Sequence, residues 1–300
     1  LDGLKDTVLI WAPRVTGSLS ILGSSSIIYL LLKDRKNKLI KPNCRILLMM
    51  SCVDVMSSFA LALSTAPIPK ESDIQGAVGN DATCTAQGFF IQLGLAVPYY
   101  NASLCTYYML YIRYNMSMRN FEKRIEPFLH AWSLFYPLAT AIVCVSMGWF
   151  NHAWDQCWIS FPNCQDDECG TKQFVIQMIC AGIGLVICLI IIIYSLVSIV
   201  LYYRKLERET RFYRHSNTGQ QEPNARISNI RREKKEISKQ AVMYIGAFLI
   251  TYTSVYVSEV IRGLSVGRIT TTLWVMTSIT LPLQGFLNFL IYSRPNIDRI

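Results

Sequence analysis

Seven apolar stretches, each long enough to cross a lipid bilayer, alternate along the chain with polar loops. In hydrocarbon every backbone N–H and C=O group must be paired within its own segment, so each stretch is predicted to be a helix. A membrane-spanning helix needs about 20 apolar residues. The predicted spans are Thr7–Leu32, Cys44–Ala66, Cys84–Tyr114, Pro127–Phe150, Phe174–Tyr203, Ile237–Ile261 and Ile269–Tyr292. The sequence therefore predicts an all-α membrane protein, a seven-transmembrane helix bundle that lies in the lipid bilayer.

Composition leaves little sequence for anything but this bundle. Of the 300 residues, 52% are hydrophobic, and seven spans take up about half of the chain. A single seven-transmembrane domain over residues 1–300 is the prediction. The chain starts with Leu and stops shortly after the last span, so both termini look trimmed.

Lysine and arginine gather on one side of the predicted membrane. Of the 29 basic residues, 23 lie in the first, third and fifth loops, at the adjoining helix ends or in the tail. The fifth loop, residues 204–236, is the richest of these segments. Because positive charge is retained in the cytoplasm, the N-terminus is predicted outside and the C-terminus inside. The net charge of +9 follows from this topology, so no nucleic-acid partner is expected.

Four of the ten cysteines fall at the outer face, which is oxidising: Cys84, Cys157, Cys164 and Cys169. An even number there favours two disulfides, and four cysteines allow three pairings. We favour Cys84–Cys157, which ties the top of the third span to the loop after the fourth, and Cys164–Cys169, which closes a small ring. Metal binding is the alternative, but no histidine or C-x-x-C spacing accompanies the four cysteines.

Asp54 lies near the middle of the second span, with apolar residues on both sides. A carboxylate at that depth has to face the bundle interior and find a polar partner, water or an ion. The candidate partners on the seventh span are Ser278, Gln284 and Asn288. Asp54 is either a structural, hydrogen-bonded residue or a switch element, and the sequence leaves both readings open.

The third span ends with Arg113 and Tyr114. An arginine at the inner end of a membrane helix is costly unless it snorkels to the interface or finds a partner. Arg113 is therefore either a simple anchor or a cytoplasmic latch, paired in the resting state and freed when helices separate.

The seventh span combines a helix breaker with a polar stripe. Pro282 allows a kink, and Gly285 permits a close approach of helices. Gln284, Asn288 and Tyr292 recur every four residues and line one helical face. This pattern is typical of a movable joint.

These features together resemble those of G-protein-coupled receptors. Arg113-Tyr114 is similar to the Arg-Tyr of the D-R-Y signature, with Ile112 in place of the acid. The Ser51-x-x-Asp54 string resembles the S-x-x-D of the second helix. The resemblance extends over essentially the whole chain. The missing acid before Arg113 leaves the basal activity open.

Two further motifs carry the resemblance, and two departures limit it. Trp132 is similar to the fourth-helix tryptophan, and as a residue it suits either the lipid interface or internal packing. Asn288-x-x-x-Tyr292 resembles N-P-x-x-Y with Phe289 in place of proline. The sixth span has no C-W-x-P motif, and the distance from Cys84 to the Arg-Tyr pair is about one turn longer than the rhodopsin-like pattern.

The subfamily resemblance is to cyclic-AMP-receptor-like receptors and their secretin-like relatives. It depends mainly on the Leu283-Gln284-Gly285-Phe286 string. Other matching strings are Gly17–Ser24, Gln87-Gly88-Phe89-Phe90 and Cys157-Trp158-Ile159. The resemblance implies a plasma-membrane receptor that binds an unknown extracellular ligand and a heterotrimeric G protein at its cytoplasmic face. It also implies that the inner ends of spans five and six part on activation. No cofactor is implied.

The ligand-binding residues can be proposed only from polarity and depth. Polar or charged residues near the outer halves of the spans are Arg14, Tyr99, Tyr100, Asn101, Glu259, Arg262 and Trp274. If the ligand is anionic, Arg14 and Arg262 are natural counterions, although Arg14 is equally suited to snorkel outward.

Other classes of seven-span protein are the alternatives to a receptor. A retinal protein needs a lysine in the seventh span, and no lysine follows Lys239. A membrane transporter of a small solute is the alternative, but the chain lacks the internal repeat typical of transporters. An enzyme is not expected, because the three histidines do not gather in one span and no catalytic cluster is visible.

Overall fold

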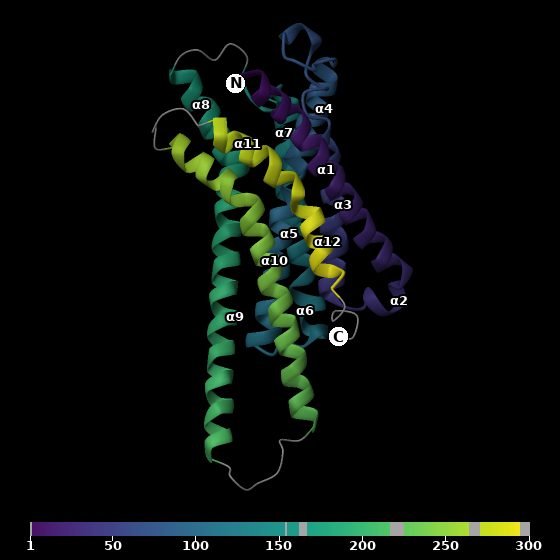
Figure 1. Ribbon diagram of the computed structural model, residues 1–300, viewed down its shortest axis with the longest axis vertical. Helices are drawn as coiled ribbons and strands as arrows, with labels where there is room; N and C mark the ends of the chain where they lie inside the picture. Colours follow the sequence, from purple (N-terminus) through teal and green to yellow (C-terminus); the bar gives the residue numbers. More distant parts are fainter. Residues whose placement is uncertain (1, 154, 162–166, 217–224, 264–270, 295–300) are drawn as a thin grey trace.

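The computed structural model describes residues 2–153, 155–161, 167–216, 225–263 and 271–294. It is a bundle of helices that run along one long axis (Figure 1). All seven predicted spans are helical, which confirms the fold class. The first, second, fourth and sixth spans are the single helices α1 (Asp2–Lys33), α3 (Pro42–Ala62), α7 (Glu126–Ser146) and α10 (Ala225–Gly263).

The other three spans are interrupted helices. The third consists of α4 (Asp81–Leu93) and α5 (Ala96–Arg113). The fifth consists of α8 (Asp167–Gln177), the π-helical turn η2 (Met178–Gly182) and α9 (Ile183–Ser216). In the seventh, the 3₁₀ turn η3 (Leu281–Leu283) separates α11 (Thr271–Thr280) from α12 (Gln284–Tyr292). Pro282 sits inside this turn, where its missing N–H breaks the helix as predicted.

Shorter elements occupy the loops. The end of the bundle where α1 begins is called the outer end, after the predicted orientation, and the opposite end is called the inner end. At the outer end, η1 (Lys70–Ser72) precedes α4, and β1 (Phe150–Ala153) pairs with β2 (Gln156–Ile159) in an antiparallel hairpin. At the inner end lie α2 (Arg35–Lys38) and α6 (Met118–Arg124). Figure 1 shows α1 beginning at one end of the bundle and α12 ending at the other, as seven crossings require. The long helices α9 and α10 project beyond the rest at the inner end (Figure 1).

Six helices in the described part of the chain are long and apolar enough to span a membrane by composition. The third span is the exception, because α5 is rich in tyrosine and also carries Asn101 and Ser103. Most residues of α5 are buried, and it packs against α3, α7, α9 and α10. A helix surrounded by protein rather than lipid can carry polar side chains. The protein is a multi-pass membrane protein whose third span forms its central helix.

The helices at the periphery expose apolar side chains. On α7, Phe128, Phe135 and Ile142 recur every seven residues and are 65%, 73% and 54% exposed. On α9 and α10, Ile190 and Ile250 are similarly exposed. Such a surface suits hydrocarbon rather than water.

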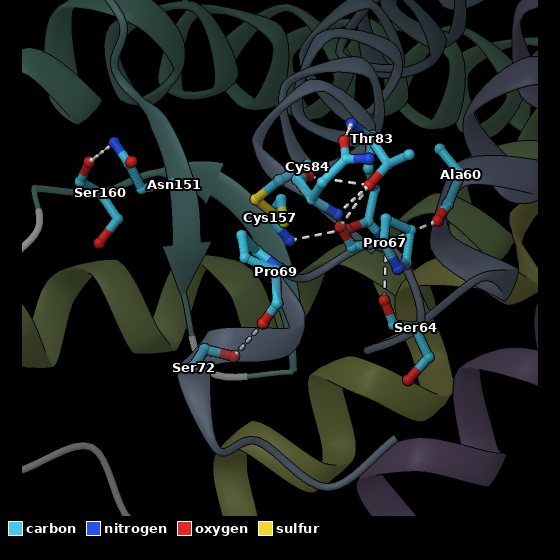
Figure 2. The surroundings of a disulfide bond; sticks show 12 residues. Ala60, Ser64, Pro67, Pro69, Ser72, Thr83, Cys84, Asn151, Cys157 and Ser160 are labelled. Carbon is cyan, nitrogen blue, oxygen red and sulfur yellow. Dashed lines mark hydrogen bonds between the residues drawn. A yellow bond between two sulfur atoms is a disulfide. The ribbon is translucent and has the colours of Figure 1, made fainter. Parts of the chain in front are cut away.

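The predicted Cys84–Cys157 disulfide is confirmed, and it joins α4 to the hairpin (Figure 2). Gln87, one turn further along α4, strengthens this link. Its side-chain amide donates to the carbonyls of Ala60 and Ser64, and its oxygen accepts from the backbone N–H of Cys157 at 2.8 Å. Cys169 is also disulfide-bonded. Cys164 lies outside the described residues, so the Cys164–Cys169 pairing stays a prediction.

Candidate functional site

A cavity of about 310 Å³ lies in the outer half of the bundle, below the β1–β2 hairpin. Its roof includes His152, Gln156 and Trp158 of the hairpin. Its floor includes Asp54 of α3 and Gln284 of α12. The volume lies at the lower end of the range of about 300–1,000 Å³ that is typical of small-molecule sites.

The wall of this outer cavity is mainly apolar, but it also carries many hydroxyl and amide groups. These groups belong to Ser57, Ser58, Ser160, Gln173, Gln177, Ser258 and Thr277, among others. Among the described residues that line the cavity, none is a lysine or an arginine. The wall is therefore suited to a ligand recognised by hydrogen bonds and apolar contact.

Asp54 at the floor is buried and hydrogen-bonded by three serines. Its Oδ2 accepts from Ser24 at 2.7 Å, Ser20 at 3.0 Å and Ser58 at 3.4 Å. Ser20 and Ser24 lie one turn apart on α1, and Ser58 lies one turn further along α3 itself. Three hydroxyl donors supply hydrogen bonds to one oxygen of this buried side chain.

The prediction that Asp54 is hydrogen-bonded by the seventh span is wrong. Ser278 bonds Asp155 instead, and Gln284 and Asn288 bond each other. The reason is that α1 packs against both α3 and α12. Its serines Ser20 and Ser24 therefore lie within hydrogen-bonding distance of Asp54. Serines four residues apart in an apolar span were a signal that sequence reasoning missed.

Gly285 closes the same cluster from α12. Its backbone N–H donates to Ser20 Oγ at 2.9 Å. A Cβ at this position would overlap Asp54 Oδ2 and the hydroxyls of Ser24 and Ser20. The predicted close approach at Gly285 is therefore confirmed, and the glycine is required because its neighbour is a buried carboxylate rather than a flexible side chain.

The polar stripe of the seventh span connects α12 to its neighbours. Gln284 accepts a hydrogen bond from Thr251 of α10 and donates to Asn288 at 3.1 Å. Tyr292, at the inner end, accepts from Lys38 of α2 at 3.0 Å. All three stripe residues are buried, so the stripe faces the bundle interior.

A second carboxylate, Asp155 at the turn of the hairpin, fastens the roof of the cavity to the seventh span. It accepts from Trp274 Nε1 at 3.2 Å and from Ser278 Oγ at 3.1 Å, both on α11. Burial raises the pKa of Asp155 from 3.8 to about 6, and the hydrogen bonds offset part of this effect. Nothing in the local sequence predicted this contact, because Asp155 is one acid among several in an outer loop.

Replacing Asp155 by asparagine is expected to stabilise the protein at pH 7.5, by on the order of 2 kcal/mol. The raised pKa means that the ionised form is disfavoured in the folded state, and a tenfold change in the ionisation equilibrium corresponds to about 1.4 kcal/mol. Asparagine avoids the buried charge and keeps both contacts, since the Ser278 hydroxyl is able to accept as well as donate. Thermal unfolding in detergent measures the difference.

The pH dependence gives this prediction its control. The protonated Asp155 carboxyl group is the form that the folded protein favours. Its contribution to stability is therefore complete below pH 3.8 and is lost as the pH rises through about 6. The wild type should therefore gain stability relative to Asp155→Asn as the pH falls from 7.5 to 5. A constant difference across that range would contradict the prediction.

Among the described residues that were predicted to contact a ligand, most do not line the outer cavity. Trp274 lines it, whereas Arg14 lies over the ring of Trp11. Tyr99 packs against Trp132 and Tyr136.

The next two residues of α5 do not line the outer cavity either, and each forms a hydrogen bond with another residue. Tyr100 bonds His130, and the Asn101 amide donates to the carbonyl of Val97. The side chains of Glu259 and Arg262 lie outside the described residues. The packing role of Trp132 is the one that the structure favours.

No protein-family profile and no curated relative matches this sequence. Among solved structures, the crystal structure of squid rhodopsin matches with a TM-score of 0.73 at 15% sequence identity. The match covers all of this chain and 80% of that one. The chain has a rhodopsin-like fold. At this identity the likeness concerns the fold alone.

The inner rim of this rhodopsin-like bundle is held by Lys234 of α10. Its ammonium donates to the side chain of Asn115 and lies 3.5 Å from the carbonyl oxygen of Ile112. Both acceptors belong to the inner end of α5, where Asn115 adopts a left-handed conformation that ends the helix. The last carbonyls of a helix carry partial negative charge, so a cation is favourable there.

For Arg113 the sequence left an anchor and a latch open. It is exposed and lies over the ring of Tyr114, with 5.5 Å between Cζ and the ring centroid. Within the described part of the chain Arg113 makes no ion pair. The preceding residue is Ile112, so Arg113 has no carboxylate directly before it in the sequence.

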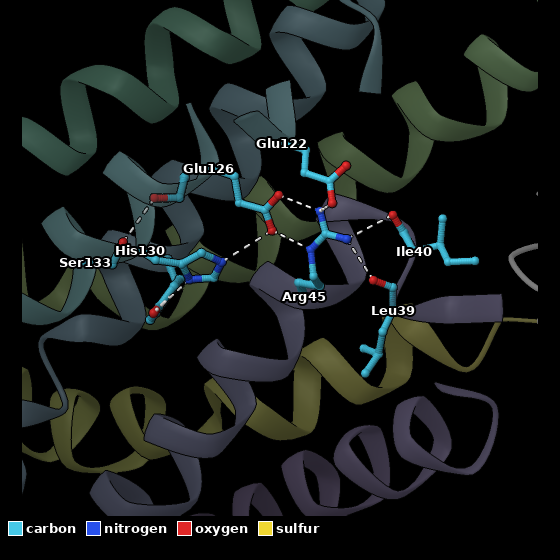
Figure 3. Close-up of polar contacts among 9 residues, drawn as sticks. Leu39, Ile40, Arg45, Glu122, Glu126, His130 and Ser133 are labelled. Carbon is cyan, nitrogen blue, oxygen red and sulfur yellow. Dashed lines mark hydrogen bonds and ion pairs between the residues drawn. The ribbon is translucent and has the colours of Figure 1, made fainter. Parts of the chain in front are cut away.

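A partly buried ion pair at the inner end joins Arg45 to Glu126 and fixes α3 to α7 (Figure 3). Two Arg45 nitrogens each donate to one carboxylate oxygen at 2.6 Å. His130 lies 3.5 Å from Glu126 and also bonds Tyr100 of α5. Sequence reasoning counted Arg45 only as a basic helix end, because its acid lies 81 residues away.

Proposed function

We propose that this protein is a G-protein-coupled receptor, which transmits an extracellular signal to a heterotrimeric G protein. The observation that carries the proposal is the arrangement of the third and seventh spans. One outer cavity reaches down to Asp54 and Gln284, and at the opposite end of the central helix Lys234 of α10 contacts Ile112 and Asn115. A rhodopsin-like fold supports this reading.

A ligand in the outer cavity acts by binding one of two bundle conformations more tightly than the other. The hydrogen bonds of Gln284 with Thr251 and Asn288 connect the cavity floor to α10 and α12. When these hydrogen bonds rearrange, α10 moves and Lys234 is released from the end of α5. The inner ends of α9 and α10 then part and expose a cleft for the G protein.

The switch set of this mechanism is Asp54, Arg113, Tyr114, Gln284, Asn288 and Tyr292, together with Lys234. In it, Arg113 and Tyr114 are exposed at the inner end, which suits contact with a partner rather than a resting latch. The basic segment 204–236, which includes the inner ends of α9 and α10, serves attraction to anionic lipid and contact with the G protein alike.

At the finer level, we place the receptor nearest the cyclic-AMP-receptor-like and secretin-like receptors. The support is the Gln284-Gly285 pair. The Gln284 side-chain amide donates to Asn288, and the lack of a side chain at Gly285 leaves room for Asp54. We further propose a single receptor domain in the plasma membrane, with the N-terminus outside. The ligand is expected to bind by hydrogen bonds in the outer cavity, and Arg14 is not expected to contribute.

The decisive experiment is nucleotide exchange on a panel of purified G proteins, catalysed by the reconstituted chain. Basal exchange with at least one G protein is the expected result. Absence of exchange with every G protein, together with solute uptake into vesicles, would instead identify a transporter. Once an agonist is known, Arg14→Ala and Arg262→Ala test the anionic-ligand hypothesis, which unchanged potency in both would discard.

A further inference from the structure

A separate cavity of about 160 Å³ lies at the inner end of the bundle, where the α2–α3 connection meets α5, α10 and α12. Lys38 and Lys41 contribute to one side of it, and Tyr108 and Tyr292 to the other. It shares no lining residue with the outer cavity. Of the switch set proposed above, Tyr292 is the one member that lines it.

Among the described residues that line this inner cavity, basic side chains outnumber acidic ones. Lys38 and Lys41 are both partly buried, whereas Lys33 and Lys36 of the same loop are exposed. The Lys38 ammonium lies 3.0 Å from the Tyr292 hydroxyl and 5.3 Å from the centroid of that ring. Asp34 is the one acid among the described residues that line the cavity.

The start of α3 adds to this charge. Asn43 and Cys44 of its first turn line the cavity, and Lys41 is the N-cap residue, with no side-chain cap of its own. The amino end of a 21-residue helix carries a partial positive charge. Two ammonium groups, a helix amino end and neutral donors are together the chemistry that recognises a phosphate.

The neutral donors complete the site. Asn43 and Gln240 contribute side-chain amides, and the tyrosines contribute hydroxyls, whereas the Asn37 amide already donates to Asp34 Oδ1 at 2.8 Å. A phosphate group has several acceptor oxygens and up to two negative charges, so it matches two lysines and several donors better than a carboxylate does.

We propose that the inner cavity binds the phosphate group of a phosphorylated ligand. Two sources present this chemistry, the headgroup of a phosphoinositide in the adjacent leaflet and a soluble inositol phosphate. Because Lys38 already contacts Tyr292 at the end of α12, the bound phosphate joins the first inner loop to the seventh span. The proposal does not depend on coupling to a G protein.

The test is a titration of the purified chain, in nanodiscs of neutral phosphatidylcholine, with inositol trisphosphate followed by calorimetry. Saturable binding is expected, and the double variant Lys38→Gln, Lys41→Gln should weaken it at least tenfold, since each lysine loses a charge-assisted hydrogen bond. The matched control is Lys33→Gln, Lys36→Gln, which removes the same charge from the same loop. It should change the affinity by less than about twofold, because exposed charges are screened.

A gain of affinity provides a test that misfolding cannot imitate. Asp34→Asn removes the acid from the cavity wall and should strengthen binding, about fivefold by the Coulomb energy of one charge near the surface. Equal losses in the two lysine pairs would attribute binding to diffuse loop charge and overturn the proposal. Absence of saturable binding to the wild type would overturn it as well.

The source is decided by competition. Nanodiscs that contain phosphatidylinositol bisphosphate are compared with nanodiscs that carry the same charge as phosphatidylserine. If the phosphoinositide alone blocks inositol trisphosphate, the cavity takes its phosphate from the membrane. If neither lipid blocks it, the soluble phosphate is the ligand. Equal blocking by both lipids would mean that surface charge alone governs binding, which contradicts a built site.

Discussion

Alanine at Gly285 is expected to destabilise the folded protein by about 3 kcal/mol and to abolish ligand-stimulated nucleotide exchange. The added Cβ would overlap the Asp54 carboxylate and the hydroxyls of Ser20 and Ser24. Overpacking of a tight interior costs about 1–3 kcal/mol, and here the displaced atoms are also hydrogen-bonded to one another. Thermal unfolding in detergent measures the first effect, and exchange on a responsive G protein measures the second.

The control for this substitution is Gly246→Ala, in α10. A Cβ at Gly246 meets no other atom within 4 Å. The same change should therefore be neutral or stabilise the helix, by up to about 1 kcal/mol. If Gly285→Ala and Gly246→Ala unfold alike, the close crossing of α12 with α1 and α3 is not a feature of the folded protein.

Glutamine at Lys234 is expected to raise basal nucleotide exchange about tenfold. It removes the ammonium that holds α10 to the inner end of α5 and leaves the rest of the rim unchanged. A hydrogen bond from a charged group contributes about 1.5–3 kcal/mol, less at a partly exposed site. A loss of about 1.4 kcal/mol from the closed conformation shifts the equilibrium tenfold.

Two further variants separate a latch from a general effect of charge. Lys235→Gln removes the neighbouring lysine, which is exposed, and should leave basal exchange unchanged. Asn115→Gly keeps the left-handed backbone but removes the acceptor, so it should raise exchange as Lys234→Gln does. An increase with Lys235→Gln that equals the one with Lys234→Gln would contradict the latch.

The sequence predicted the spans well, because each depends on local apolar content. The third span shows where this reasoning weakens. By composition α5 falls short of a membrane helix, and only its burial among four other helices explains why its tyrosines and Asn101 are tolerated. The hairpin was not predicted at all. Its two strands of four residues are held by the disulfide and by Gln87, neither of which is a local signal.

The candidate site was predicted in part. The depth of Asp54 in its span indicated a buried, partnered carboxylate, and the spacing of Gln284 and Asn288 indicated an inward stripe. Their partners could not be predicted, since several polar residues lay at suitable depths on different spans. The same limit applies to Arg45, whose acid on α7 is far away in the sequence.

Hydrophobicity and charge along the chain were sufficient to predict helices that cross a bilayer, their number and the side that carries the basic loops. These properties belong to each segment by itself, because they depend only on how that segment interacts with lipid or with water. The tertiary structure decided which side chains meet: Ser20 and Ser24 with Asp54, Asp155 with Trp274, Lys234 with Asn115. Such pairings depend on the rotation and crossing of helices, which are set by packing between segments distant in the sequence.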